Sequence, residues 1–260
     1  MMAVCKSANN KIVPVVFVLV DEEIFSSWKW FLKCLKEFVI QNRKTCIISN
    51  RHLGILSAID MMLEQFPNMG MHRFCLEHIK ANIAGKFPGQ KLRSLYQRVG
   101  FTLNATKCVK AWEKLANKSP ATAQCLDSIG ANKWTILGDG GNRWVVVTTN
   151  ASESYNNALK GARLLPIIAL IKSSLLKTVK LFNDNYEKIE KCQTILTPHY
   201  MAKYNKWMLC GMRHKVTVFS KHSQLYEVVT GPHDNRPWKG RKTQEVQFGA
   251  GICTCLKWQT

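Results

Sequence analysis

The pattern of apolar and polar residues predicts alternating strands and helices over the first 75 residues. Apolar, partly β-branched stretches on either side of a polar turn at 8–11 predict a β-hairpin, and two further short apolar stretches predict single strands. Between them, apolar residues recur every three or four positions, which predicts two amphipathic helices. In chain order we expect strands at 1–7 and 12–20, a helix at 26–39 capped by Ser26 or Ser27, a strand at 45–49, a helix at 53–66 and a strand at 71–75. Alternating strands and helices are typical of a mixed α/β fold.

The remainder of the chain has a more helical pattern and a β-rich end. Residues 76–130 are basic and helix-forming, with breaks at Pro88 and Pro120, and a Gly- and Asn-rich stretch predicts a loop. In chain order we expect helices at 91–99 and 107–115, a loop at 131–143, an apolar β-branched stretch at 144–149, helices at 152–162 and 167–189, and short strands at 216–219 and 225–229 around a turn at 231–237.

Composition and charge narrow the class of protein. Apolar residues make up 46% and charged residues 21% of the 260 positions, values that are ordinary for a globular chain and argue against wholesale disorder. The formal net charge is +20, and residues 1–65 hold only eight basic and six acidic side chains, so most of the excess follows residue 65. Such an excess indicates a polyanionic partner, nucleic acid above all, and argues against an enzyme with a small-molecule substrate.

Basic and aromatic residues are interleaved in two of the expected helices, where they could bind phosphate groups. They are Lys91, Arg93, Tyr96 and Arg98 in the first, and Lys172, Lys177, Lys180 and Phe182 in the second. A solvated helix face explains each stretch equally well. The hypothesis that the chain binds DNA therefore depends on the summed charge.

Neither a membrane span nor a secretion signal is expected. The longest apolar run, at 12–20, is nine residues long and contains Pro14, whereas a bilayer span needs about 20 residues. Acidic residues follow this run where a signal peptide has small residues at its cleavage site. The ten cysteines have no framework spacing, so we expect reduced thiols in an intracellular protein.

Cys253 and Cys255 form a C-x-C pair near the end of the sequence. Two thiolates at this spacing can chelate one zinc ion, but a structural zinc site has four ligands. The pair is therefore either half of a zinc site or two ordinary thiols.

His72, Cys75 and His78 form a second cluster with the pattern H-x-x-C-x-x-H. If Cys75 and His78 open a helix, their spacing places both side chains on one face. They are then half of a metal site, or a buried thiol and a hydrogen-bonded imidazole at a strand-to-helix turn. The structural interpretation is favoured because two further ligands do not lie nearby in the sequence.

Glu153 and Asn50 are the candidate residues for phosphoryl-transfer chemistry. An acid in the first turn of a helix interacts favourably with the helix dipole, which alone would explain Glu153. Alternatively Glu153 holds a divalent cation, and two-metal chemistry then needs two or three converging carboxylates. The end of the strand at 45–49 is where an α/β sheet would offer one of them, but the residue there is Asn50, a neutral amide.

Segments with these motifs, taken in order, resemble the Mutator-like element (MULE) transposases, especially those of plants. The matching segments are 3–20 with 26–32 for the family's second and third strands and first helix, 47–56 for its second-acid segment, 72–78 for its C-x-x-H motif, and 148–163 for its third-acid segment. Cys253 and Cys255 stand where these proteins have the first half of a SWIM zinc finger, C-x-C…C-x-H.

This resemblance implies an incomplete RNase H-like transposase core within the mixed α/β class. The implied domains are a partial core at 1–78, a helical insertion at 79–143, the C-terminal helical part of the core at 144–214 and the start of a small, β-rich SWIM-type zinc finger at 215–260. The family cleaves DNA and transfers strands with two Asp, one Glu and Mg²⁺. By the same resemblance, Glu153 matches the final acid, and Cys75 and His78 match the C-x-x-H motif.

The chain departs from the family at its catalytic acids. Asn50 stands at the position of the second Asp, and the first Asp, on a strand that would precede Met1, is absent. We therefore expect Glu153 to be a remnant acid, Mg²⁺ not to be used and transposase activity to be lost. Because the missing strand is central in RNase H-like sheets, the hairpin and the strand ending at Asn50 are expected to face each other across a gap.

The favoured function is a degenerate transposase-derived protein that retains DNA binding and, through an incomplete site, zinc binding. An alternative is an exapted DNA-binding transcriptional regulator of the far-red-response type, and a third possibility is a basic protein-interaction module. Salt-sensitive binding of duplex DNA separates the first two from the third, and sequence specificity separates the second from the first. Family and charge together predict a nuclear location, while the oligomeric state is not predicted.

Overall fold

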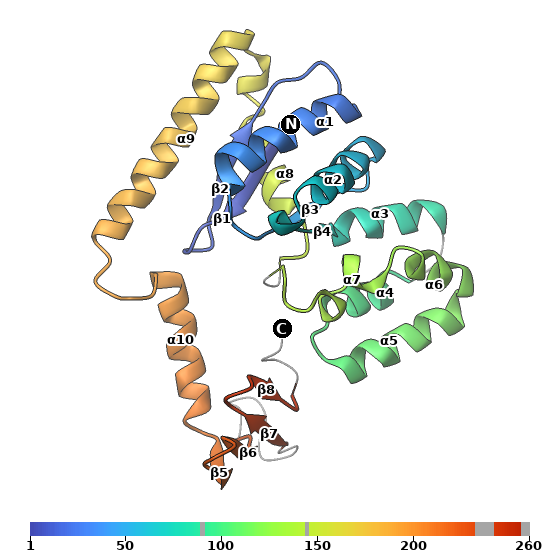
Figure 1. Cartoon of the computed structure of the whole chain (residues 1–260), viewed down its shortest axis with the longest axis vertical. Helices are drawn as coiled ribbons and strands as arrows, with labels where there is room; N and C mark the ends of the chain where they lie inside the picture. The colour runs from blue at the N-terminus through green and yellow to red at the C-terminus, as the bar shows by residue number, and fades with distance from the viewer. Residues whose placement is uncertain (89–91, 144–145, 232–241, 256–260) are drawn as a thin grey trace.

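The computed structural model describes residues 1–88, 92–143, 146–231 and 242–255, which form a mixed α/β protein (Figure 1). Its first elements are strands β1 (Met2–Lys6) and β2 (Ile12–Phe17), helix α1 (Phe25–Cys34) with a π-helical continuation (Leu35–Ile40), β3 (Thr45–Ser49), α2 (Leu53–Gln65), a 3₁₀ turn (Pro67–Met69) and β4 (Gly70–Phe74). The order of strands and helices predicted over this region is confirmed.

The start of α1 differs from the prediction. Its N-cap is Ile24, which makes no side-chain capping hydrogen bond, so the expected cap at Ser26 or Ser27 is wrong. Both serines lie inside the first turn, where a side chain no longer caps the helix. The position of α1 is set instead by burial, because Phe31 and Leu32 pack with α2 in the core cluster of this half of the protein.

The four strands of this region form two separate two-stranded sheets. Strands β1 and β2 pair antiparallel, with a register shift between Ala3 and Val4, and β3 and β4 pair in parallel. Within the described ranges, β1 has no strand partner besides β2, and β3 has none besides β4. Two unbridged pairs of strands agree with the expectation drawn from the family resemblance.

A helical block with a core of its own follows β4. It comprises α3 (Leu76–Lys86), α4 (Arg93–Phe101), α5 (Ala105–Lys118), α6 (Pro120–Asp127), α7 (Ala131–Trp134) and a 3₁₀ turn (Leu137–Asp139). The segment 131–143, predicted to be a loop, is thus partly helical. Trp134 is 1% exposed, and its burial holds α7 in the core of the block. Helix α6 was not predicted, although Ser119 caps it and Pro120 begins it. The domain boundary expected after residue 78 falls within α3.

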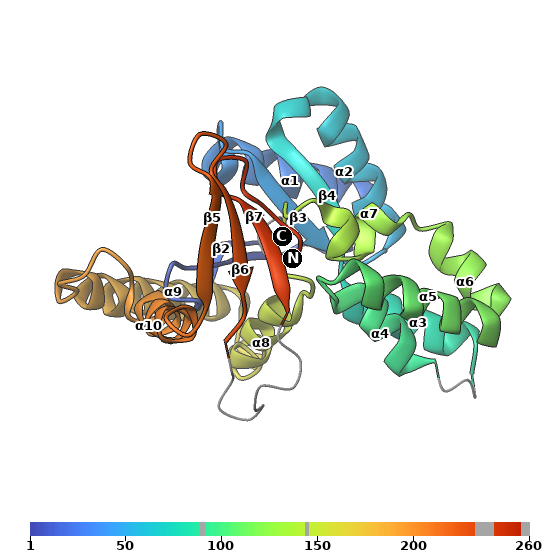
Figure 2. The ribbon, with the colours of Figure 1, turned by 90° about the horizontal axis from the view of Figure 1, so that it is seen from below.

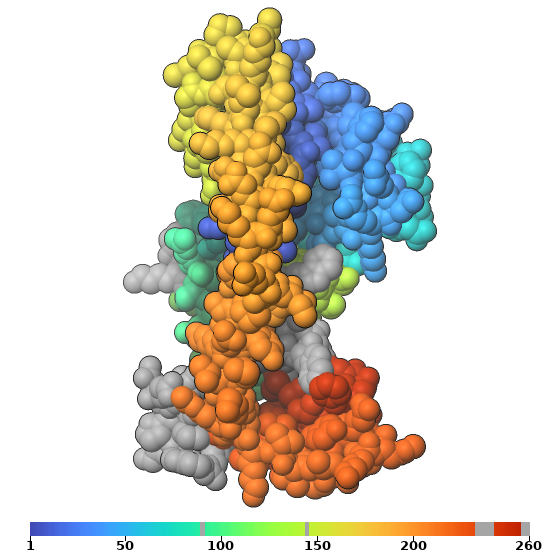
Figure 3. All heavy atoms as spheres, turned by 90° about the vertical axis from the view of Figure 1, so that its left-hand side faces the viewer, coloured from blue at the N-terminus to red at the C-terminus, as the bar shows by residue number. Residues whose placement is uncertain are grey.

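The last part of the chain runs back past the first sheets and ends in a third sheet. It comprises α8 (Asn150–Ala158), a 3₁₀ turn (Ala162–Leu164), α9 (Ile167–Glu190), α10 (Pro198–Gly211), β5 (Lys215–Ser220), β6 (Leu225–Val229), β7 (Thr243–Gln247) and β8 (Ile252–Cys253). Helices α9 and α10 lie along the edge of the molecule opposite the helical block, and α10 leads to the sheet of β5 to β8 (Figures 1, 2 and 3).

The elements of this last part of the chain differ in several places from those predicted. Residues 146–149 are not a strand, and the helix expected from 152 begins two residues earlier, at Asn150. The β-branched side chain of Val147 is buried in the core of the helical block, and burial in a connection produces the same apolar pattern as a strand. Helix α10 and strands β7 and β8 were not predicted. Most of the turn expected at 231–237 lies outside the described residues.

No helix in the described part of the chain combines the length and apolar character that crossing a membrane requires.

Candidate functional site

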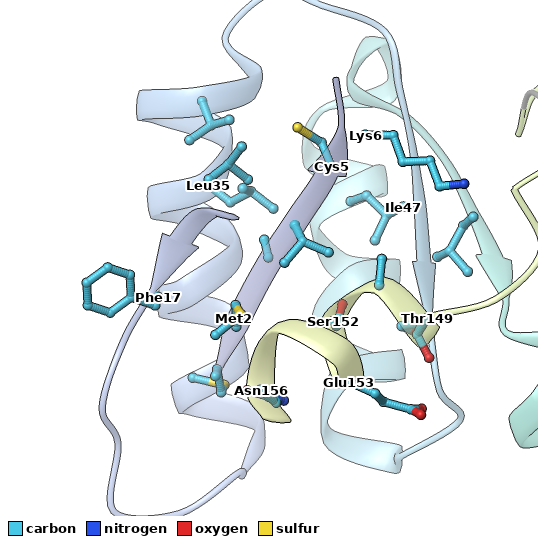
Figure 4. Close-up of a pocket in the computed structure, with 18 of the residues that line it drawn as sticks. Met2, Cys5, Lys6, Phe17, Leu35, Ile47, Thr149, Ser152, Glu153 and Asn156 are labelled. Carbon is cyan, nitrogen blue, oxygen red and sulfur yellow. The ribbon is translucent and has the colours of Figure 1, made fainter. Parts of the chain in front are cut away.

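A pocket of about 1230 Å³ lies between the two small sheets, and residues from the whole length of β1 and β3 line it (Figure 4). Apolar residues of α1 and its continuation, among them Phe31 and Leu35, form one wall. Helix α8 forms part of another wall with Ser152, Glu153 and Asn156. The pocket therefore combines an apolar interior with a polar rim.

Backbone groups that lack strand partners border this pocket on two sides. Met1 and Val18 exchange hydrogen bonds of 2.8 and 2.9 Å, so the antiparallel alternation directs the N–H and C=O of Met2 away from β2. On the other side, Ser49 O accepts a hydrogen bond from Cys75 N at the end of β4, so the alternate residue Ile48 directs its backbone groups away from β4. Both outward edges face the pocket, where such groups need hydrogen-bond partners.

Cys75, His78 and Glu153 come together at the rim through Thr149, the N-cap of α8. Cys75 is buried at the N-cap of α3, and its Sγ accepts hydrogen bonds from Thr149 N (3.2 Å) and Thr149 Oγ1 (3.3 Å). Thr149 Oγ1 also lies 3.4 Å from His78 Nδ1, and His78 Nε2 lies 3.9 Å from Glu153 Oε1. The C-x-x-H pair thus holds the N-terminus of the helix that carries Glu153, which agrees with the structural interpretation of this motif.

The sequence suggested Cys75, His78 and Glu153 as residues of two motifs of one core, but it did not indicate Thr149, which connects them. A threonine before a polar helix start is a common capping residue, and that was the available signal. Here its side chain makes no capping hydrogen bond to α8 and contacts the C-x-x-H pair instead.

Asn50 follows β3 and lines the same pocket as Glu153. Its Oδ1 accepts a hydrogen bond from the backbone N of His52 at 3.2 Å. The carboxyl ends of parallel strands are where α/β sheets place ligand-binding residues, so the position suits a metal ligand while the residue type does not. An amide oxygen can coordinate a cation but does not neutralise it.

The donor set at this rim does not fit a pair of Mg²⁺ ions. Two-metal sites need several converging carboxylates, and beside Asn50 the rim offers Glu153, whose Oε1 lies 3.9 Å from His78 Nε2. Glu23, before α1, is the other carboxylate among the described pocket residues. Across the described ranges, no three His, Cys, Asp or Glu side chains are close enough together to hold a metal ion.

The third member of the H-x-x-C-x-x-H pattern, His72, lies apart from this group. Its ring is buried, and its Nε2 is hydrogen-bonded to Ser49 Oγ at 2.8 Å across the β3–β4 pair. Burial, together with the nearby positive charges of Lys133 and Arg73, lowers the pKa of His72 to about 4. His72 is therefore a neutral residue of the core at pH 7, not a partner of Cys75 and His78.

A buried charge cluster beside the pocket was not anticipated. Asp139 pairs with Arg73 Nε from β4, and its Oδ2 accepts a hydrogen bond from Arg143 N at 2.7 Å. Arg143 is 1% exposed and lines the pocket, and its Nε and one terminal nitrogen have no hydrogen-bond partner among the described residues. Burial lowers the pKa of Arg143 despite the nearby Asp139. The available signal in the sequence was an acidic and a basic residue, Asp139 and Arg143, on either side of two glycines. In the structure both glycines have positive φ.

Cys253 and Cys255 lie together at the end of β8, with their sulfur atoms 2.9 Å apart. Their proximity is compatible with two thiolates on one metal ion, but the described ranges offer no third ligand of the His, Cys, Asp or Glu type. A structural zinc site needs four ligands, and these two thiols would supply half of them.

Comparison with known proteins finds a similarity for the first part of the chain. Residues 1–82 match the family model of the MULE transposase domain. The matched segment contains β1 to β4, Asn50, Cys75 and His78, whereas Glu153 lies outside it. No curated protein matches the chain. The match supports the relationship to MULE transposases that the sequence motifs predicted.

Proposed function

Because residues 1–82 match the MULE transposase domain, we propose that this chain is a transposase-derived protein that binds DNA without cutting it. The observation that carries this proposal is the composition of the rim. The rim offers the carboxylate of Glu153, whose Oε1 lies 3.9 Å from His78 Nε2, and the position at the end of β3 holds the neutral Asn50. Without further negative charge there, a pair of Mg²⁺ ions loses the electrostatic stabilisation that is usually the largest catalytic term.

The proposed core is an incomplete RNase H-like sheet. Support comes from the β1–β2 hairpin, the parallel β3–β4 pair, and the position of α8 at the carboxyl end of β3. The pocket between β1 and β3 is large enough for one more strand, since five residues of strand occupy about 800 Å³ at the usual strand and sheet spacings. The helical block then interrupts this core between β4 and α8.

The proposal for the C-terminal part is the beginning of a SWIM-type zinc finger. Support comes from the antiparallel sheet of β5 to β8 and from the two thiols at its end. A zinc ion bound there would take its remaining ligands from outside the described residues. We derive no function from zinc alone.

The proposed partner is duplex DNA, and the proposed location is the nucleus, where that partner is found. The support is the net charge of +20, most of which follows residue 65. A transcriptional regulator of the far-red-response type remains the second candidate. It requires preference for one duplex sequence over shuffled sequences of the same composition, which transposase-derived, backbone-directed binding does not require.

Duplex DNA is expected to bind this protein with a strong salt dependence. Two phosphate contacts alone weaken binding about tenfold between 50 and 200 mM NaCl, and each further contact adds to this loss. Fluorescence anisotropy with a labelled 30-base-pair duplex over a series of salt concentrations measures this. Binding that is absent, or that does not respond to salt, would show that the proposed partner is wrong.

Supercoiled plasmid incubated with the protein and Mg²⁺ or Mn²⁺ is expected to stay supercoiled. Nicking above the level of a mock-purified sample, measured on agarose gels, would oppose the proposal. Glu153→Gln is the control that identifies the source of any cleavage. Nicking lost in this variant would be the protein's own activity, whereas nicking that persists would come from a contaminating nuclease.

A further inference from the structure

Helix α5 presents one face to the core of the helical block and a lysine-rich face to solvent. Ala111 and Leu115 are buried, and Cys108 and Trp112 pack against the same core. The exposed side bears four lysines at positions i, i+3, i+7 and i+11: Lys107, Lys110, Lys114 and Lys118. Residues at these intervals lie along one side of an α-helix, so the four lysines form a stripe about 16 Å long.

Helix α4 contributes further exposed positive charge next to α5. It packs beside α5 and exposes Arg93 and Arg98. Glu113 is the one acidic residue of the two helices. Among the described residues, no carboxylate lies within ion-pair distance of Lys107, Lys110 or Lys114. Lys107, Lys110, Lys114, Arg93 and Arg98 make up what we call the α4–α5 face, and its charge is not neutralised by an ion pair with any described carboxylate.

Protein stability does not account for the stripe. Like charges three and four residues apart on a helix destabilise it, so the arrangement opposes folding of α5. The helix is nevertheless held firmly, because Asn104 Oδ1 accepts a hydrogen bond from Lys107 N at 2.9 Å and the opposite face is buried. A rigid row of exposed cations is suited to a ligand with regularly spaced negative charges.

We propose that the α4–α5 face, with Lys107, Lys110 and Lys114 at its centre, binds the phosphate backbone of duplex DNA. Adjacent lysines of the stripe are separated by about 4.5 to 6 Å along the helix axis. One DNA strand carries a charge every 3.4 Å or so along the duplex axis, which provides a phosphate within reach of each flexible lysine. The face lies on the side of the molecule opposite α9, away from the pocket between β1 and β3 (Figures 1 and 2).

This inference rests on the proposed DNA binding and assigns it to a surface outside the region matched by the MULE family model. Contacts to phosphates neutralise charge and release counterions but do not read bases. The α4–α5 face is accordingly expected to bind shuffled duplexes of equal length equally well.

The test is a salt titration of DNA binding by the full chain and two triple variants. In the first, Lys107, Lys110 and Lys114 are replaced by Gln, which has a similar helix propensity. In the matched control, the exposed Lys29, Lys33 and Lys44 are replaced by Gln, which removes the same charge elsewhere. Circular dichroism spectra of both variants establish that their helix content equals that of the wild type.

The first variant is expected to lower the slope of log K against log salt concentration by about 2.7, because three phosphate contacts are lost. Its affinity at 100 mM NaCl is expected to fall by about tenfold or more. The control variant is expected to keep the wild-type slope. An unchanged slope in the first variant, or an equal loss in both, overturns the assignment while the proposed function stands. Wild-type protein that does not bind DNA at all overturns both.

Competition with polyglutamate separates DNA from an acidic protein as the partner of this face. At equal charge concentration, polyglutamate is expected to displace the labelled duplex much less well than unlabelled duplex does. Equal displacement would assign the α4–α5 face to acidic protein segments and overturn the proposal.

Discussion

Gly70→Ala is expected to lower the free energy of unfolding by more than about 4 kcal/mol. Gly70 begins β4 with φ +135°, a conformation that residues with a side chain rarely adopt. It lies opposite Thr45 in the parallel β3–β4 pair, and a Cβ added to it would be 1.7 Å from the carbonyl oxygen of Thr45. Because that obstacle is backbone, the clash cannot be relieved by a side-chain rotation, and the start of the β3–β4 pair must separate.

Urea unfolding followed by circular dichroism measures this effect, with soluble yield as a second readout if the variant does not fold. Gly85→Ala is the matched control. Gly85 lies on an exposed side of α3, where an added Cβ meets no atom within 4 Å. Alanine there is expected to be neutral or to stabilise the protein by up to about 1 kcal/mol. A wild-type midpoint for Gly70→Ala would contradict the structure of the β3–β4 pair.

Acid is expected to destabilise the protein through His72 by about 3 kcal/mol in total. The pKa of His72 is about 4 in the folded protein, against an ordinary value of 6.5 that the unfolded chain retains. Between these two values the unfolded state binds more protons than the folded state. Stability due to His72 is therefore complete above pH 6.5 and is lost progressively as the pH falls from 6.5 to 4.

The charged groups near His72 also favour its neutral form. The positive charges of Lys133 and Arg73 both oppose protonation of His72. The buried ring has Ser49 Oγ as its hydrogen-bond partner. Protonation of His72 thus adds an uncompensated charge to the core of the β3–β4 pair.

Urea unfolding of wild type and His72→Gln at pH 7.5, 5.5 and 4.5 tests this dependence. Glutamine can bond to Ser49 Oγ but does not gain a proton, so the variant is expected to lose less stability with acid than the wild type does. Carboxylates contribute equally to both proteins, so their difference isolates the histidine. The exposed His52 provides a control, since His52→Gln is expected to keep the wild-type pH dependence. Equal pH dependence in His72→Gln and wild type would contradict a buried neutral imidazole.

The residues of the candidate site illustrate what could be predicted before the fold was known. Glu153, Asn50, Cys75 and His78 are separated by up to about 100 positions, and motif order in the sequence suggested that they belong together. The contacts between their side chains could not be predicted from motif order. The contact of Thr149 with Cys75 and His78, and the proximity of His78 to Glu153, depend on how α8 approaches α3.

Arg143 and His72 show the limit of residue-by-residue reasoning more clearly. An arginine in a Gly- and Asn-rich segment suggests an exposed loop, yet Arg143 is 1% exposed because Asp139 and the turn between them fold it against Arg73. His72 shares a regular spacing with Cys75 and His78, but strand and helix geometry direct it to a different place. Three-residue spacing places side chains together only within one helix, and here β4 ends between His72 and His78.

By itself, the sequence determined the order of strands and helices over the first 75 residues, the relationship to MULE transposases and the excess of positive charge. These properties depend on local periodicity, on motif order and on composition, all of which are carried by residues near one another in the chain. Only the tertiary structure decided that α1 and α8 line the pocket between the β1–β2 and β3–β4 pairs, and that Glu153 faces His78. Such features arise from the packing of distant segments, whose free energy depends on shape and burial that local patterns do not encode.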